Sequence, residues 1–188
     1  MILTVPLLAA LSLASSEAAA RPGPKAPVEY FVHAHQELDI ERDSPKWNAL
    51  SEEEKAKHED EPGVFADASD TLVLQERGRD RLALCLSHTG MLLHLCQVSG
   101  VATRDKNGDF VLRDPSDDPE ATGDCVLVIR RTRDKMEITE SENPPSDCRR
   151  HCGWRASFSD IEFALTDKLD AAGLVAQKGN LEDCELPP

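Results

Sequence analysis

Alternation of apolar and polar residues becomes regular near residue 70 and continues through most of the chain. In "RLALCLS" (81–87) every second residue from Leu82 to Leu86 is leucine, which is the period of two expected for a β-strand. Further short segments have this strand-like character and are separated by turn signals such as "RGRD" and "TRD": 71–76, 91–104, 110–114, 125–131, 135–140 and 155–165. The pattern predicts a mainly β fold, a small antiparallel barrel or sandwich.

The dipeptide Asn107-Gly108 marks the clearest turn in this pattern. A two-residue hairpin turn needs positive φ at both central positions, which asparagine and glycine tolerate best. Pairing outward from such a turn places Thr103 opposite Leu112. In this register Cys96 faces the polar side, so we expect a bulge at Gly100 that turns it inward.

The first 69 residues have a different character. Residues 1–20 combine an apolar run with Ala18-Ala19-Ala20, which is typical of a cleaved secretory signal peptide. Residues 21–69 are rich in proline and charge, and we expect a flexible or lightly docked, partly helical arm before a β domain at 70–188. Within this arm, Ser44 before Pro45 and the "SEEEK" box at Ser51 predict two short helical turns.

Charge narrows the range of partners. The chain carries 35 acidic and 21 basic residues, a net charge of −14. Such a protein repels nucleic acid and anionic lipid and attracts cationic proteins. After signal cleavage no segment is apolar enough to span a membrane, so we expect a secreted or periplasmic product.

The cysteines predict a disulfide-stapled domain. An even number of cysteines in an exported chain is typical of a disulfide framework, and all six lie in the second half: Cys85, Cys96, Cys125, Cys148, Cys152 and Cys184. If Cys96 pairs with Cys125, then Cys85 and Cys184 remain to tie down the C-terminal tail. A Cys85–Cys96 bridge is the competing arrangement.

The stretch "SDCRRHCGW" raises a separate question about Cys148 and Cys152. A local disulfide between them would form a tight turn that displays Arg149, Arg150 and His151 as partner-binding residues. The alternative joins each cysteine to a different strand, for example at Cys125 or Cys96. Zinc and redox interpretations fit less well, because the spacing is C-x-x-x-C and exported thiols tend to oxidise.

Neither a metal site nor an active site is predicted. His33 and His35 lie two apart on one side of an extended segment and could bind copper or zinc, but we interpret them as surface histidines. The chain lacks the G-x-S-x-G, H-E-x-x-H and phosphate-loop motifs. We therefore expect a non-enzyme with no cofactor.

Residues 92–163 resemble small exported bacterial disulfide-bonded β domains of the lysozyme-inhibitor type. The similarity is in a pattern of cysteines and small residues: Cys96, Gly100, Ala102, Cys125, Cys148, Cys152, Gly153 and Arg155. One inhibitor family plugs its enzyme's cleft with a disulfide-closed loop that contains histidine, and "CRRHC" is similar in character. The resemblance implies a plug of Arg149, Arg150 and His151 for a cleft lined by carboxylates.

These observations favour a binding protein that inhibits a lysozyme-like cell-wall hydrolase or gives immunity against it. One alternative is a metal-binding envelope protein that uses His33, His35, His94 or His151. Another is an envelope structural or adaptor domain without inhibitory activity.

Overall fold

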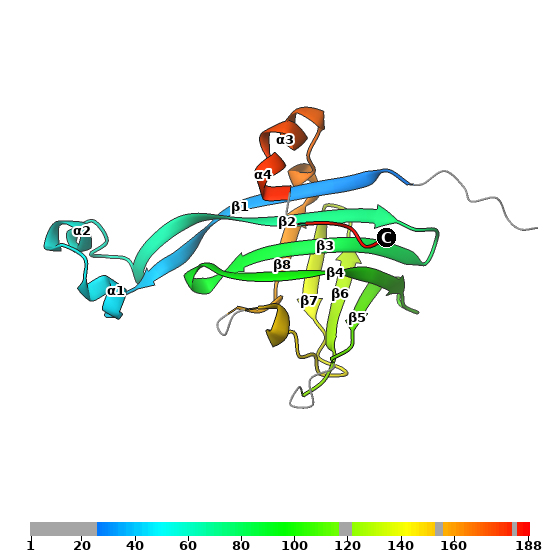
Figure 1. Cartoon of the computed structure of the whole chain (residues 1–188), viewed down its shortest axis with the longest axis horizontal. Coiled ribbons are helices and arrows are strands. Elements are labelled where there is room, and N and C mark those ends of the chain that lie inside the picture. Colours follow the sequence, from blue (N-terminus) through cyan, green and yellow to red (C-terminus); the bar gives the residue numbers. More distant parts are fainter. Residues whose placement is uncertain (1–25, 117–121, 153–155, 182–183) are drawn as a thin grey trace, which may run out of the picture.

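The structure, a computed structural model, describes residues 26–116, 122–152, 156–181 and 184–188. In the described residues eight strands form one antiparallel sheet whose spatial order is the sequence order (Figure 1). The strands are β1 (Val28–Glu41), β2 (Gly63–Glu76), β3 (Arg81–Gly90), β4 (His94–Arg104), β5 (Phe110–Asp114), β6 (Cys125–Arg131), β7 (Lys135–Glu140) and β8 (Ile161–Ala164). The helical segments are α1 (Pro45–Asn48), α2 (Glu52–Ala56), α3 (Ala171–Ala176), α4 (Lys178–Leu181) and the 3-10 turns η1 (Met91–Leu93), η2 (Arg149–His151) and η3 (Leu165–Asp167).

The sheet curls into a nearly closed barrel, which confirms the predicted fold class. The seam lies between β1 and the chain that follows β8, where the amide of Leu169 donates to the carbonyl of Tyr30 at 2.8 Å. Inside the seam the rings of Phe31 and Phe163 meet edge to face with centroids 6.4 Å apart. This aromatic pair joins the first strand to the last and buries both rings completely.

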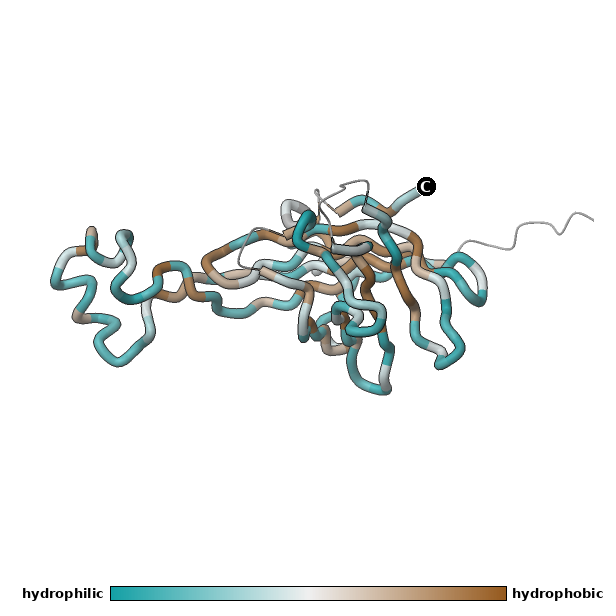
Figure 2. Tube along the Cα trace, turned by 90° about the horizontal axis from the view of Figure 1, so that it is seen from below, coloured by the Kyte–Doolittle hydropathy of each residue, from teal (hydrophilic) through white to brown (hydrophobic). Residues whose placement is uncertain are grey.

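Alternate residues of every strand fill the barrel. The inward positions form one continuous apolar cluster that includes Leu72, Leu84, Leu127, Ile138 and Phe163. Figure 2 shows this as hydrophobic colour gathered along the strands of the barrel, while loops are hydrophilic. The period of two in the sequence is therefore the inside–outside alternation of a barrel wall.

The hairpin at Asn107-Gly108 forms, but the predicted register is wrong by one residue. Thr103 pairs with Val111 rather than with Leu112, because the loop has three residues, 106–108, between Asp105 and Asp109. The side chain of Asp105 accepts from the amides of Asn107 and Asp109, and only Gly108 takes a positive φ, +94°. A type I turn followed by a left-handed glycine needs this extra residue.

The corrected register also removes the expected bulge at Gly100. The β3–β4 register is regular from Arg81 to Gly90, and Cys96 faces the core with no exposed surface. A one-residue slip moves every side chain to the other face, which is why the prediction placed Cys96 wrongly. Gly100 serves another purpose, since a Cβ there would lie 2.5 Å from Cδ1 of Leu112.

The expectation of a flexible or lightly docked arm at 21–69 is wrong for most of its length. Residues Val28–Glu41 and Gly63–Glu76 are strands β1 and β2, paired antiparallel along their length. Phe31 is fully buried in the core, and the stretch 28–32, apolar except for Glu29, starts the strand. The charge density beyond residue 36 masked that strand signal. The proposed signal peptide, 1–20, lies outside the described residues.

The predicted helical turns sit at the end of this hairpin. Ser44 accepts from the amide of Trp47 at 3.1 Å, with Pro45 at the first helical position. Ser51 and Glu54 form the predicted capping box. Residues 63–70 of β2 do not pair with β3, so this part of β2 forms with β1 a two-stranded ribbon that projects from the barrel and ends in α1 and α2 (Figure 1).

The C-terminal segment covers the outer face of β2 and β3. A disulfide joins Cys85 in β3 to Cys184, as predicted, although the assumed Cys96–Cys125 partner bond is wrong. Val73, Cys85 and Cys184 form a second buried cluster against which Tyr30 and Leu186 pack. Residues 82–86 of β3 are therefore buried on both faces.

Candidate functional site

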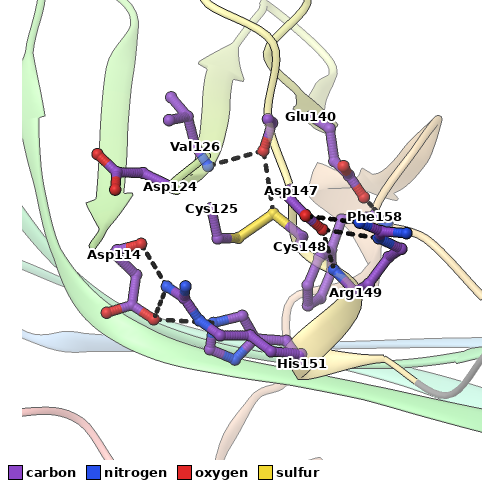
Figure 3. Close-up of a disulfide and its surroundings, with 12 residues drawn as sticks. Asp114, Asp124, Cys125, Val126, Glu140, Asp147, Cys148, Arg149, His151 and Phe158 are labelled. Carbon is purple, nitrogen blue, oxygen red and sulfur yellow. Dashed lines mark hydrogen bonds and ion pairs between the residues drawn. A yellow bond between two sulfur atoms is a disulfide. The ribbon is translucent and has the colours of Figure 1, made fainter. Parts of the chain in front are cut away.

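Disulfides join Cys148 and Cys152 to two different strands. Cys125 at the start of β6 bonds to Cys148, and Cys96 in β4 bonds to Cys152 (Figure 3 shows the former). The predicted Cys148–Cys152 staple is wrong, and the alternative of separate strand partners is correct. Local spacing favoured the staple, but Cys96, Cys125 and Cys148 all lie in the core, where the sheet brings distant cysteines together.

Asp147 and Arg149, on either side of Cys148, form a bidentate ion pair. Nε and Nη2 of Arg149 donate to the two carboxylate oxygens of Asp147 at 2.9 and 2.8 Å. The hydroxyl and the amide of Thr122 donate to the same carboxylate at 2.8 and 3.1 Å. These bonds, those from Arg149 first, hold the pKa of Asp147 well below its usual range.

Arg150 and His151 both pair with Asp114 at the end of β5, and Figure 3 shows His151 turned toward that carboxylate. Nη2 of Arg150 lies 2.7 Å and Nε2 of His151 lies 2.8 Å from the same carboxylate oxygen. Partial burial would raise the pKa of Asp114, but the hydrogen bonds from Arg150 and then His151 outweigh it and lower that pKa. The turn is therefore an internal set of ion pairs.

The expected outward display holds for Arg149 and is wrong for His151, whereas Arg150 is exposed as a residue but has its side chain paired with Asp114. The side chains of Arg150 and His151 are 29% and 19% exposed, whereas Arg149 is 74% exposed. Their role in partner binding stays a prediction. The sequence analysis singled out neither Asp147 nor Asp114. The position of Asp147 two residues before Arg149 is a local signal that could have indicated it, whereas Asp114 comes from another strand and only the fold reveals it.

A second candidate surface is the projecting ribbon and its helical tip, residues 37–67, which we call the acidic ribbon. It carries eleven acidic and four basic residues, a net charge of −7 and half of the total for the chain. Figure 2 shows the tip as mostly hydrophilic and set apart from the apolar barrel. Sequence reasoning found the charge but did not place it on an ordered projection.

The basic side chains of the acidic ribbon are engaged within it. Lys46, Lys55 and Lys57 pair with carboxylates of the same segment at 3.4, 2.8 and 3.9 Å. The guanidinium of Arg42 donates to backbone carbonyls, including that of His58 at 2.6 Å, and lies 5.0 Å from the centroid of Trp47. Exposed carboxylates therefore set the sign of the outer surface.

The histidines of the metal-binding alternative are divided among three elements. His33 and His35 lie on the inner face of β1, His94 begins β4, and His151 lies in η2 beside Asp114. Within the residues that the structure describes, no group of three or more histidine, cysteine, aspartate or glutamate side chains is arranged to hold a metal ion.

Comparison with protein-family models, curated proteins and solved structures finds no match for this chain. All six cysteines are in disulfides, which indicates an oxidising extracellular or periplasmic environment. None of the helices in the described ranges has the length and apolar character needed to cross a membrane.

Proposed function

We propose that this protein is an exported, non-catalytic binding protein that uses its acidic ribbon to bind a cationic protein. The observation that carries the proposal is the net charge of −7 on an ordered projection that stands clear of the barrel. Clustered charge of one sign speeds association with a partner of the opposite sign and fixes its orientation.

The partner class we propose is a secreted or periplasmic lysozyme-like cell-wall hydrolase, which the protein inhibits or confers immunity against. Basic hydrolases match the charge of the acidic ribbon, and residues 92–163 resemble inhibitor domains in their cysteine pattern. A disulfide-stapled barrel offers a rigid support for such a contact. No free thiol is present to act as a nucleophile.

The turn with Arg149, Arg150 and His151 is the second contact in this proposal. To bind carboxylates of a hydrolase cleft, Arg150 and His151 would have to exchange their bonds to Asp114 for bonds to the enzyme. Breaking the bonds to Asp114 offsets part of the binding free energy gained from the new bonds, so we assign the larger part of the binding free energy to the acidic ribbon.

The proposal is tested by binding kinetics with a basic lysozyme at low and moderate salt. The ribbon variant is Asp43→Asn/Glu59→Gln/Asp60→Asn, which neutralises three exposed carboxylates. We expect its association rate constant at low salt to fall about 3-fold or more, with a weaker salt dependence.

The matched control neutralises three exposed carboxylates outside the ribbon, Glu76→Gln/Asp80→Asn/Glu142→Gln. Its net charge changes by the same amount, so it should bind with nearly the wild-type rate. An equal fall of the association rate constant in both variants would mean that the ribbon acts only through its contribution to net charge. Absence of binding by the wild-type protein would contradict the proposal and favour a structural or adaptor role.

A further inference from the structure

Histidines and carboxylates replace apolar residues at one end of the barrel's inner face. On β1 the inward position Phe31 is followed by His33 and His35. Asp70 of β2 lies opposite His33 in the register, and His88 follows on β3. Asp70 is only 4% exposed. Ionisable side chains clustered beside an apolar core are candidates for a functional site.

Two of these imidazoles have one ring nitrogen held by a carboxylate. Nδ1 of His88 lies 2.9 Å from Oδ1 of Asp70, and Nδ1 of His33 lies 3.1 Å from Oδ2 of Asp167. An ionised carboxylate only accepts hydrogen bonds, so in the neutral imidazole Nδ1 carries the proton and Nε2 the lone pair.

The carboxylates are themselves held in place. Asp70 accepts from the amide of Thr89 at 2.9 Å, and Asp167 accepts from the amide of Ala164 at 3.0 Å. This chain of backbone, carboxylate and imidazole is the arrangement that orients metal-binding histidines in proteins.

His35 lies between the rings of His33 and His88 and takes the other tautomer, with the proton on Nε2 and the lone pair on Nδ1. Its Nε2 lies 3.1 Å from the carbonyl oxygen of Thr89, which can only accept, so Nε2 carries the proton. Its Nδ1 is buried and has no hydrogen-bond partner. An unsatisfied lone pair in a buried position is unfavourable and becomes satisfied when a cation binds.

The rings stack in a row with little tilt. The centroids of His33 and His35 are 5.8 Å apart with an interplanar angle of 15°, and those of His35 and His88 are 6.4 Å apart at 18°. The carboxylates of Asp70 and Glu37 lie 4.0 and 3.6 Å from Nε2 of His35. The surroundings of the row are thus acidic, which favours a cation.

We propose that His33 and His35 bind one borderline divalent cation, Cu²⁺ or Zn²⁺, with Nε2 of His33 and Nδ1 of His35 as protein ligands. Water completes the coordination, so the site uses fewer side chains than a preformed three-residue centre. The His33 side chain, 43% exposed, turns to bring its Nε2 toward His35, and this rearrangement exchanges its hydrogen bond to Asp167 for the bond to the cation. Imidazole ligands suit both ions, and Cu²⁺ binds more tightly than Zn²⁺ to a given nitrogen site.

The test is calorimetric titration of the purified, metal-free protein with Cu²⁺ and with Zn²⁺ near neutral pH. We expect one ion per chain, tighter binding of Cu²⁺, and weaker binding in acid because protons compete for the imidazoles. His35→Asn should weaken binding more than about tenfold. The matched control, His58→Asn, changes a histidine of the acidic ribbon and should leave binding unchanged.

His33→Gln provides a second ligand variant on a more exposed side chain, in case His35→Asn disturbs folding. Nitrogen hyperfine splitting from two imidazoles in the electron paramagnetic resonance spectrum of the Cu²⁺ complex should be lost or halved in it. Absence of binding, or equal affinity of wild type and both ligand variants, would overturn the proposal. Because this inference does not depend on partner binding, either proposal can fail alone.

Discussion

The double substitution Cys85→Ala/Cys184→Ala removes the bond that holds the C-terminal segment against β3. Cys85 and Cys184 are 99 positions apart in sequence. With the Cys96–Cys152 bond intact, however, the covalent path runs 11 positions from Cys85 to Cys96 and 32 positions from Cys152 to Cys184. The effective loop is therefore slightly under half the length of the nominal one.

The chain-entropy relation assigns about 4 kcal/mol to closing a loop of about 45 residues in the unfolded state. The apolar neighbours of the two cysteines, among them Val73 and Leu186, are unchanged in the variant. We therefore expect the free energy of unfolding to fall by about 4 kcal/mol. The denaturant slope should rise because the unfolded chain is less constrained.

Urea unfolding of the oxidised wild type and the variant, followed by circular dichroism, measures both quantities. A loss below about 1 kcal/mol with an unchanged slope would refute the reasoning. Proteolysis under native conditions provides a control for local detachment: if only the tail comes free, cleavage near α3 and α4 should increase while the global transition stays in place.

Three further predictions concern local geometry and pH. Gly108→Ala should lower the free energy of unfolding by about 1 kcal/mol or more, because φ of Gly108 is +94°. Asn107→Ala should change it by less than about 0.5 kcal/mol. Equal losses for the two variants in urea unfolding would contradict the three-residue turn. Gly100→Ala should cost about 1–3 kcal/mol through its clash with Leu112, and Leu112→Val should recover part of that in the double variant; additive losses would argue against the contact. Because the pKa of Asp114 is lowered in the folded state, its ionised form stabilises the fold at pH values above the unfolded-state pKa of about 3.9, and this stabilisation is lost as pH falls through the folded-state pKa. The melting temperature of Asp114→Asn should therefore fall less steeply in acid than that of the wild type. Identical pH profiles of the melting temperature would exclude this contribution.

The fold class was predictable because its main signals are local. Period-two alternation, such as that of Leu82 to Leu86, marks strands independently of their partners, and the turn at Asn107-Gly108 marks a hairpin. The capping residues Ser44 and Ser51 act within their own helical turns and were also read correctly. Such signals do not need tertiary contacts to operate.

Register and long-range pairing were not predictable in the same way. Whether the hairpin loop has two or three residues depends on small differences in turn energy. The side chain of Asp105 favours the three-residue loop because it accepts hydrogen bonds from the amides of Asn107 and Asp109. The partners of Cys148 and Cys152 depend on which strands lie behind them in the barrel. The composition of 28–41 gave a wrong prediction, because half of the strand is polar and Phe31 is its one fully buried residue.

The candidate site was predictable in residue type but not in arrangement. Arg149, Arg150 and His151 were singled out from the sequence, yet the carboxylate of Asp114 that binds two of them comes from a strand 36 residues earlier. The histidine row likewise combines His33 and His35 with Asp70 and His88 from other strands. Pairs of charges that meet across strands become visible only when the register is known.

The most direct test of the central claim is lysis of a bacterial cell-wall suspension by a basic lysozyme, measured with increasing amounts of the oxidised protein. We expect a dose-dependent loss of lytic rate that weakens as salt is raised and is smaller for the ribbon variant. Unchanged lysis at a large excess of the protein would contradict the proposal that it inhibits such an enzyme.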